Sequence, residues 1–444
     1  PLHLRSKNNE TQRRRQNSGH CYFMNPQNFS KSQIIIIVIV GLIILFFVLV
    51  FFGIIPGLQK NGLNRPKEAE LAFWGIEDES VMREMINSYS SANPNAKIRY
   101  QQFDETDYEK TLINALAGNK GPDVFMIKNS WLIKHYDKIF PAPETQFLLT
   151  QLRQLFPKII ETDFSLRQNS EQATIYALPL HLDTLAFIYN KNFFDRKGIA
   201  LPPRTCSDFQ RIIPKLREFD LSGRLVKTAG AIGGSEKSIN KATDLLNLIM
   251  LQNGKKMVDE QSLNFYLQFG NPGSIYYTWN NNLRSSLDNF SQETNAAIFN
   301  YASAIKIVKS KNPFIDIGVS PMLQFNLENP VNYANYWGLT VSKQSKNQET
   351  SWNFIISLTA NQQIAEQYLQ LSGRTPALRT LIQKYSNDPD IGVFTQQALT
   401  AESWLQQDDN EIRNIFSNMI EFILSGKLTP KEALEEAENK INSL

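Results

Sequence analysis

One carboxylate stands in an otherwise apolar stretch of this chain and is its clearest candidate for chemistry. The stretch is residues 176–190, YALPLHLDTLAFIYN, where the apolar run is broken only by Pro179, His181, Asp183 and Thr184. A run of this kind between polar segments predicts a strand buried on both faces. A carboxylate inside it is costly unless it meets a partner or a ligand. We therefore expect Asp183, with His181, to face a cleft.

Further polar and aromatic candidates follow predicted strands or lie in loops. In a parallel sheet, ligands bind beyond the carboxyl ends of the strands. Carboxylates and amides that exchange hydrogen bonds with hydroxyls, beside indoles that cover apolar faces, suit a sugar. Each residue also has a structural alternative. Such indoles more often pack in a hydrophobic core, and such carboxylates more often interact with the dipole at the start of a helix. The candidates are Glu77 and Asp78, the stretch Lys128 to Trp131 with Asn129 and Ser130, and Trp279 with Asn280.

The sequence lacks the short motifs of common enzymes. It contains no G-x-S-x-G, H-E-x-x-H, phosphate loop or G-x-G-x-x-G. Its four histidines, at positions 3, 20, 135 and 181, are too scattered for a metal site. Cys206 has a small buried thiol as its simpler explanation and an enzyme nucleophile as the alternative. Two carboxylates that meet in a cleft could still act as acid and base. We predict a protein that is not an enzyme and holds no metal or cofactor.

The N-terminal region predicts a membrane anchor. Residues 1–33 are polar and contain Arg13 to Arg15, whereas residues 34–55 carry no charge. At about 1.5 Å per residue the second segment would extend about 33 Å, enough for a hydrocarbon core of about 30 Å. The arginines could bind nucleic acid or anionic lipid, but positive charge beside a span more commonly marks the cytoplasmic side. We expect a cytoplasmic tail, a transmembrane helix, a linker at 56–68 and an extracytoplasmic domain at 69–444.

The rest of the chain has a globular composition. Of its 444 residues 42% are hydrophobic and 20% charged, and the net charge is only +3, so no basic face for nucleic acid is expected. Strands predicted near 71–75, 97–103 and 124–127 alternate with helices near 80–89 and 106–117. This alternation predicts an α/β fold with a parallel sheet and helical crossovers.

Several segments between about Leu71 and Leu444 have a characteristic order and spacing. They are LAFWG at 71–75, GPDVFMI at 121–127, ALPLHLDTLAFIYNKNFFDRKGI at 177–199, LPPRTCSDF at 201–209, YTWN at 277–280, NYWGLTVSK at 335–343, GRTPALR at 373–379 and SGKLTPKEALEEAENKI at 425–441. Through these segments together, the chain resembles the extracellular solute-binding proteins of ABC transporters, in the family that includes maltose-binding and other sugar-binding receptors.

The resemblance implies a periplasmic-binding-protein-like fold of type II, in which two α/β lobes close on ligand about a hinge. Lobe 1 would comprise about 69–178 and 315–363, and lobe 2 about 179–314 and 364–444. The ligand contacts of the family map onto Glu77 and Asp78, Asn129 to Trp131, Asp183, and Trp279 with Asn280. Trp337 and Trp404 are further candidates by the same resemblance.

Several positions depart from the pattern of this family. Cys21 precedes the predicted span, so it does not match the lipid-anchoring cysteine of many relatives, and the span would replace that anchor. Cys206 stands where the family often has Trp, and Glu293 and Ala297 stand where Gly and Met are usual. The type of ligand is therefore not transferred from any one relative.

These observations predict a membrane-anchored substrate-binding protein. It would capture a mono- or oligosaccharide by lobe closure and deliver it to the permease subunits of an ABC importer. A tethered sensor or adhesin that uses the same fold without a transporter is the alternative.

Overall fold

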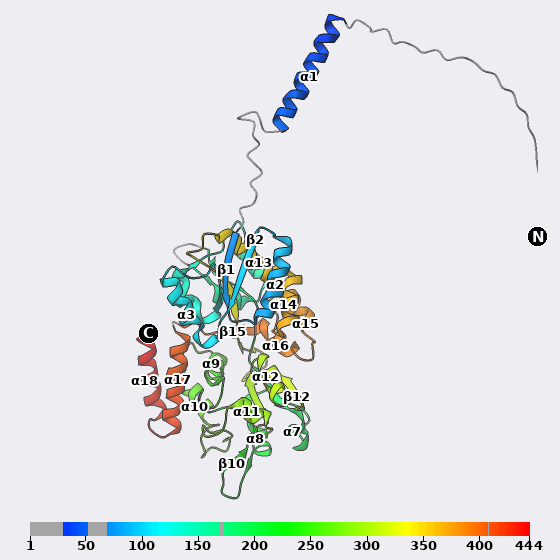
Figure 1. Cartoon of the computed structure of the whole chain (residues 1–444). Coiled ribbons are helices and arrows are strands. Elements are labelled where there is room, and N and C mark those ends of the chain that lie inside the picture. Colours follow the sequence, from blue (N-terminus) through cyan, green and yellow to red (C-terminus); the bar gives the residue numbers. More distant parts are fainter. Residues whose placement is uncertain (1–29, 52–68, 168–171, 407) are drawn as a thin grey trace, which may run out of the picture. The chain divides into compact units, whose positions relative to one another are not determined.

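The computed structural model describes residues 30–51, 69–167, 172–406 and 408–444 (Figure 1). The chain divides into two compact units, residues 1–67 and 68–444. In the first unit the structure describes one helix, α1 (Lys31–Phe51). Among the described residues, no helix combines the length and apolar character required to cross a membrane. Most of the predicted tail, the end of the span predicted at 34–55 and the whole linker at 56–68 lie outside the described residues.

The second unit contains two hydrophobic cores, which define two mixed α/β lobes. Lobe 1 is built on a sheet in the order β2-β1-β3-β14-β4, with β7 also paired to β14. The first three strands are parallel, as predicted, and β14 is antiparallel to β3. The strands are β1 (Ala69–Gly75), β2 (Ala96–Gln102), β3 (Val124–Lys128), β4 (Ile139–Phe140), β7 (Leu178–Pro179) and β14 (Trp337–Ser342).

Helices complete the core of lobe 1. Every residue of β3 is buried, and its first four residues are apolar, as expected for a central strand covered on both faces. The apolar stripe of α2 carries Met85 and Tyr89 into this core, and the ring of Tyr89 meets Phe354 of α13 at 5.0 Å between centroids. The helices are α2 (Glu79–Ala92), α3 (Glu105–Ala117), α4 (Leu132–His135), α5 (Leu149–Leu155), α6 (Lys158–Phe164), α13 (Gln348–Ala360), α14 (Gln362–Ser372) and α15 (Arg379–Tyr385).

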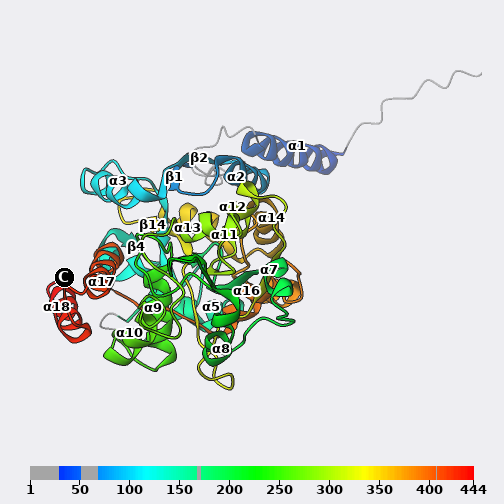
Figure 2. The ribbon, with the colours of Figure 1, turned by 90° about the horizontal axis from the view of Figure 1, so that it is seen from below.

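Lobe 2 has a smaller, antiparallel sheet. Its central strand is β8 (Ala186–Asn190), which lies between β11 (Ala297–Asn300) and β12 (Ile317–Ser320). Figures 1 and 2 both show α17 beside α18 at the edge of this lobe. The helices are α7 (Lys191–Arg196), α8 (Cys206–Leu216), α9 (Ala242–Gln252), α10 (Glu260–Leu267), α11 (Ser286–Ser291), α12 (Ser303–Lys311), α17 (Asp409–Leu424) and α18 (Pro430–Asn442).

Short elements complete the unit. They are β5 (Ser165–Leu166), β6 (Thr174–Ile175), β9 (Glu218–Phe219), β10 (Leu225–Lys227), β13 (Asn332–Tyr333), β15 (Ala401–Glu402), α16 (Gly392–Gln397), and the 3-10 turns η1 (Asn129–Trp131), η2 (Tyr136–Lys138) and η3 (Ala398–Thr400).

The chain crosses between the lobes at positions that differ from the predicted ones. The first crossover is not at 179, because Leu182 still packs in the core of lobe 1 and Leu185 is the first residue in that of lobe 2. The second lies near Ala334 rather than 315, since β12 pairs with β8 of lobe 2. The third follows α15 rather than residue 363, because α14 buries its apolar face against α2 and α13.

Candidate ligand-binding site

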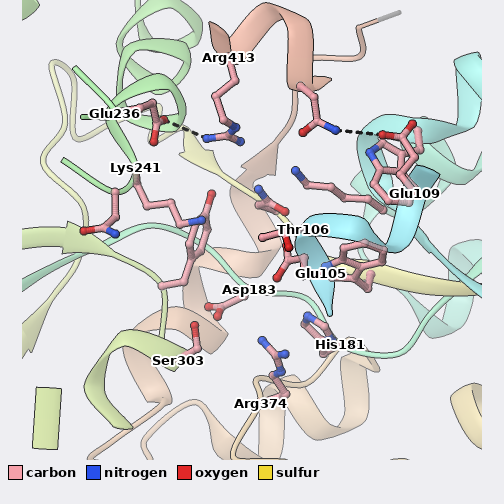
Figure 3. Close-up of a pocket in the computed structure, with 17 residues that line it drawn as sticks. Glu105, Thr106, Glu109, His181, Asp183, Glu236, Lys241, Ser303, Arg374 and Arg413 are labelled. Carbon is pink, nitrogen blue, oxygen red and sulfur yellow. Dashed lines mark hydrogen bonds and ion pairs between the residues drawn. The ribbon is translucent and has the colours of Figure 1, made fainter. Parts of the chain in front are cut away.

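A cavity of about 370 Å³ lies between the two lobes (Figure 3). Lobe 1 lines it from the end of β3, the start of β14 and the start of α3, and lobe 2 from the residues before α9 and α12 and from α17. The lining residues are Glu105, Thr106, Glu109, Lys128, Trp131, His181, Asp183, Glu236, Asn240, Lys241, Tyr301, Ser303, Asn335, Trp337, Arg374, Asn410 and Arg413.

Two indoles form an apolar wall on the side of lobe 1. Trp131 sits in η1, directly after β3, and Trp337 opens the antiparallel neighbour β14. Their rings meet edge to face, with centroids 5.0 Å apart and an interplanar angle of 79°. Behind them Tyr108 is fully buried and stacks on Trp131 at 6.3 Å. Because Tyr108 also donates its hydroxyl to the main chain of β1 and β3, this wall is held rigidly.

Asp183 lies at the first crossover and is only 3% exposed. Its carboxylate accepts hydrogen bonds from the backbone N–H of Thr184 at 2.9 Å and of Ala302 at 3.2 Å. Burial raises the pKa of Asp183 to about 6, although the Arg374 guanidinium and the two N–H groups act in the opposite direction. Among the described residues no cation forms an ion pair with it. Asp183 therefore retains acceptor capacity toward a ligand.

Beside Asp183, one histidine and one arginine complete this end of the cavity. His181 is buried, and its Nδ1 lies 3.3 Å from the hydroxyl of Tyr368. Burial, with a smaller effect of Arg374, holds the pKa of His181 well below its usual range, so the imidazole is neutral. Arg374 donates to the buried carboxylate of Glu77 at 2.9 Å.

Lobe 2 contributes an ionic cluster around Arg413. This guanidinium donates to Glu236 and to Asp244, each at 3.0 Å. Tyr301 donates its hydroxyl to Asp244 at 2.8 Å, and the ammonium of Lys241 lies 5.4 Å from the centre of the Tyr301 ring. Burial would raise the pKa of Asp244, but the surrounding cations, Arg413 foremost, lower it to about 2. The cavity therefore presents hydrogen-bonding groups whose charges are largely balanced within the protein.

Comparison with known proteins identifies the family. The model for bacterial extracellular solute-binding proteins matches residues 74–365. The chain belongs to this family.

Individual relatives are distant. The galactooligosaccharide-binding protein of Bacillus subtilis is 24% identical over 412 residues, which cover 86% of this chain and 91% of that protein. A maltotriose-binding protein of Pyrococcus abyssi is 25% identical over 135 residues, which cover 30% of this chain and only 27% of that protein. An ABC substrate-binding protein from Listeria monocytogenes in complex with cycloalternan has a TM-score of 0.69 at 17% identity, over 85% of this chain and 99% of that one. The structural likeness establishes the fold.

In this solute-binding protein the cavity brings together Trp131, His181, Asp183 and Trp337 of the predicted site residues. Glu77 and Asp78 instead border an adjoining hollow of about 990 Å³, which shares Ser303 and Arg374 with the cavity. Asp78 caps α2 by accepting from the N–H of Ser80 at 2.8 Å, which is the helix-terminus role named as its alternative.

The neighbours of Trp131 face the protein interior. Asn129 donates its amide to Asp163 at 3.0 Å and accepts from the N–H of Tyr336 at 3.3 Å. Ser130 is buried and does not line the cavity. Both residues shape η1 and so position the indole that follows them.

Three predicted contacts lie away from the cavity. Trp279 is fully buried in the core of lobe 2 and donates its indole N–H to Ser238 at 3.0 Å. Asn280 donates its amide N–H to the hydroxyl oxygen of Tyr277 at 3.1 Å. Trp404 stacks on Phe416, with centroids 5.8 Å apart and the rings 7° from parallel. Trp279 and Trp404 pack within lobe 2 instead of facing the cavity. The side chain of Asn280 forms a local hydrogen bond instead.

The sequence did not single out most of the charged lining of the cavity. Arg374 lies within GRTPALR, a segment noticed only for its resemblance, and Lys128 only as the start of its stretch. Arg413 is on an amphipathic helix, where a cation is typical of a solvated face. Its place in the cavity becomes evident only from its ion pairs with Glu236 and Asp244, which are far away in the sequence. The described residues contain no cluster of His, Cys, Asp and Glu able to hold a metal ion.

Proposed function

We propose that the cavity between the lobes binds a carbohydrate, either a mono- or an oligosaccharide. The observation that carries this proposal is the wall formed by Trp131 and Trp337, which shares one cavity with Asp183 and a set of amides and hydroxyls. Indole faces suit the apolar faces of a pyranose, and a carboxylate accepts well from sugar hydroxyls. The charges of the lining are balanced mainly by neighbouring side chains, which favours a neutral ligand.

Lobe closure gives the site its mechanism in this proposal. Since each lobe supplies part of the lining, a ligand that contacts both parts binds the closed form more tightly and shifts the population toward it. Closure also removes water from the polar contacts, which strengthens them. The names of the relatives support the proposed ligand class, because they include proteins that bind galactooligosaccharide and cycloalternan.

The cellular role that we propose is delivery of the captured sugar to an ABC importer from the outer face of the cell membrane. The run of uncharged residues at 34–55 would anchor the protein, with residues 1–33 in the cytoplasm. Retention of the full chain in membranes washed with alkaline carbonate would support the anchor, and release into the supernatant would contradict it.

A thermal-shift screen tests the ligand class. The purified full chain is heated with sugars, polyols, amino acids and peptides, and the midpoint of unfolding is recorded. We expect sugars to raise the midpoint, because a ligand that binds only the folded state stabilises it. The variant Trp131→Ala should lose most of this shift, whereas Trp279→Phe, which alters an indole outside the cavity, should keep it. Stabilisation by peptides alone would refute the proposal.

A further inference from the structure

Consecutive residues around the start of α17 each meet a different element of lobe 1. Asp408 accepts from the ammonium of Lys134, in α4, at 2.5 Å. Asp409 forms an ion pair with Lys128, at the end of β3. Asn410 donates its amide to Glu109, in α3, at 2.9 Å. We name these six residues the α17 clasp.

Four members of the clasp, Lys134, Asp408, Glu109 and Asn410, form a continuous network, and Lys128–Asp409 is a separate ion pair beside it. Lys134 donates to Glu109 as well as to Asp408, and Glu109 also meets His135 Nε2 at 2.8 Å. The Lys128 and Asp409 side chains are only 10% and 7% exposed. Burial disfavours the charged form of Lys134, yet its two carboxylate partners raise its pKa above the ordinary value. Shielded, shared charges of this kind interact more strongly than pairs on an open surface.

The clasp joins the two lobes. On one side Ile412, Phe416 and Met419 fix α17 in the core of lobe 2. On the other side α3 and β3 belong to lobe 1. Lys128, Glu109 and Asn410 also line the cavity, so part of the clasp borders it, and Figure 3 marks the contact to Glu109 with a dashed line. Separation of the lobes at the clasp would pull these charged groups apart.

We propose that the α17 clasp holds the lobes together and thereby sets the affinity of the site, with Lys134 and Asp408 as positioning residues that do not line the cavity. A protein that already populates its binding-competent form loses less affinity to the cost of closure. The clasp would act in this way for any ligand of the cavity. It therefore goes beyond the carbohydrate proposal and does not depend on it.

The arrangement offers variants that remove charge and little else. Lys134→Met keeps most of the aliphatic stem, and Asp408→Asn keeps a residue type that caps helices well. This matters because Asp408 also accepts from the N–H of Glu411 at 3.1 Å as the N-cap of α17. Arg153→Met is the matched control, since Arg153 and Glu161 form a pair at 2.6 Å within lobe 1 alone.

The test measures the distance between the lobes in the ligand-free full chain by pulsed dipolar electron spin resonance. Spin labels are placed at Asp107→Cys, on α3, and at Lys237→Cys, on the opposite rim of the cavity; both positions are exposed. A Cys21→Ser background removes one native thiol, and burial protects the other, Cys206.

We expect Lys134→Met and Asp408→Asn each to shift the distance distribution to longer values, and the double variant to shift it no further than either alone. The control should match the parent protein. Raising NaCl to 1 M should lengthen the parent distances as well, because salt screens partly exposed pairs. Distributions that are unchanged in both variants and at high salt would overturn the proposal. If a variant fails to fold, as judged by circular dichroism, the salt series on the parent decides. The outcome is independent of the carbohydrate proposal because no ligand is used.

Discussion

Replacing Asp183 by Asn separates its contribution to binding from its contribution to the fold. The carboxylate accepts from the N–H groups of Thr184 and Ala302, which tie the first crossover to the start of α12. An Asn carbonyl oxygen can still accept from these groups, whereas Ala cannot. The variants Asp183→Asn and Asp183→Ala should therefore both weaken ligand binding, but they should change the free energy of unfolding to different degrees.

The magnitudes follow from burial and charge. Burial raises the pKa of Asp183 from 3.8 to about 6, so the ionised form is disfavoured in the folded protein. That shift corresponds to roughly 3 kcal/mol at most, and a neutral Asn is relieved of it. The relief offsets the weaker hydrogen bonds to the two N–H groups, so we expect Asp183→Asn to change the free energy of unfolding at pH 7 by less than about 1 kcal/mol. Asp183→Ala is relieved of the same penalty but leaves both groups unpaired, so it should be about 2–4 kcal/mol less stable than Asp183→Asn.

Binding should weaken in both variants. Loss of a charged acceptor for a ligand hydroxyl costs about 1.5–3 kcal/mol, or roughly a tenfold to hundredfold increase in Kd. In the parent protein, affinity should also fall as the pH drops from 7 to 5, because the carboxylate becomes protonated near its pKa of about 6. Asp183→Asn should lack this pH dependence.

Urea denaturation gives the free energies of unfolding, and calorimetric titration gives Kd for the sugar that stabilises the parent most. The reasoning is refuted if Asp183→Asn binds that sugar as tightly as the parent at pH 7. It is also refuted if both variants lose stability equally, because Asp183 would then act through its charge on the fold.

Three further variants probe other parts of the account. Trp279→Phe should leave Kd unchanged but lower the free energy of unfolding by about 1–3 kcal/mol, since a buried indole and its N–H bond are lost; weaker binding at unchanged fold would return Trp279 to the site. Arg374→Ala should destabilise the ligand-free protein by roughly 3 kcal/mol in urea, because Glu77 remains buried and unpaired; a loss no larger than that of Arg153→Ala would contradict this. Burial raises the pKa of Asp163 to about 6. The parent should therefore gain stability relative to Asp163→Asn as pH falls from 6 to 4 and lose it as pH rises through 6; parallel pH profiles would disprove this.

The sequence indicated a cavity residue where a charged side chain stands in a segment expected to be buried. Asp183 could be placed at a cleft because a carboxylate within an apolar run needs a partner or a ligand. A different argument made Trp131 a candidate, since it comes directly after a buried strand, at the edge of the sheet where ligands bind, although such an indole is more often core. Both arguments use only neighbouring residues in the sequence, and in the structure both side chains line the cavity.

The errors concern information that no single segment contains. Trp131 and Trp279 both stand in polar surroundings in the sequence, and only tertiary packing decides that one indole lines the cavity while the other fills a core. The strand β12 has an ordinary apolar pattern that does not specify β8 as its partner, so the second crossover was placed too early. Arg413 resembles a solvated residue until Glu236 and Asp244 lie beside it.

A fluorescence titration tests most directly whether the cavity between the lobes is the carbohydrate site. Maltotriose and a galactooligosaccharide are titrated into the parent protein and into Trp131→Phe, Trp337→Phe and Trp279→Phe, and tryptophan emission is followed. We predict a saturable change in the parent with at least one of the sugars, a change retained in Trp279→Phe and strongly reduced in the other two variants. An unchanged sugar response in both Trp131→Phe and Trp337→Phe would contradict the account.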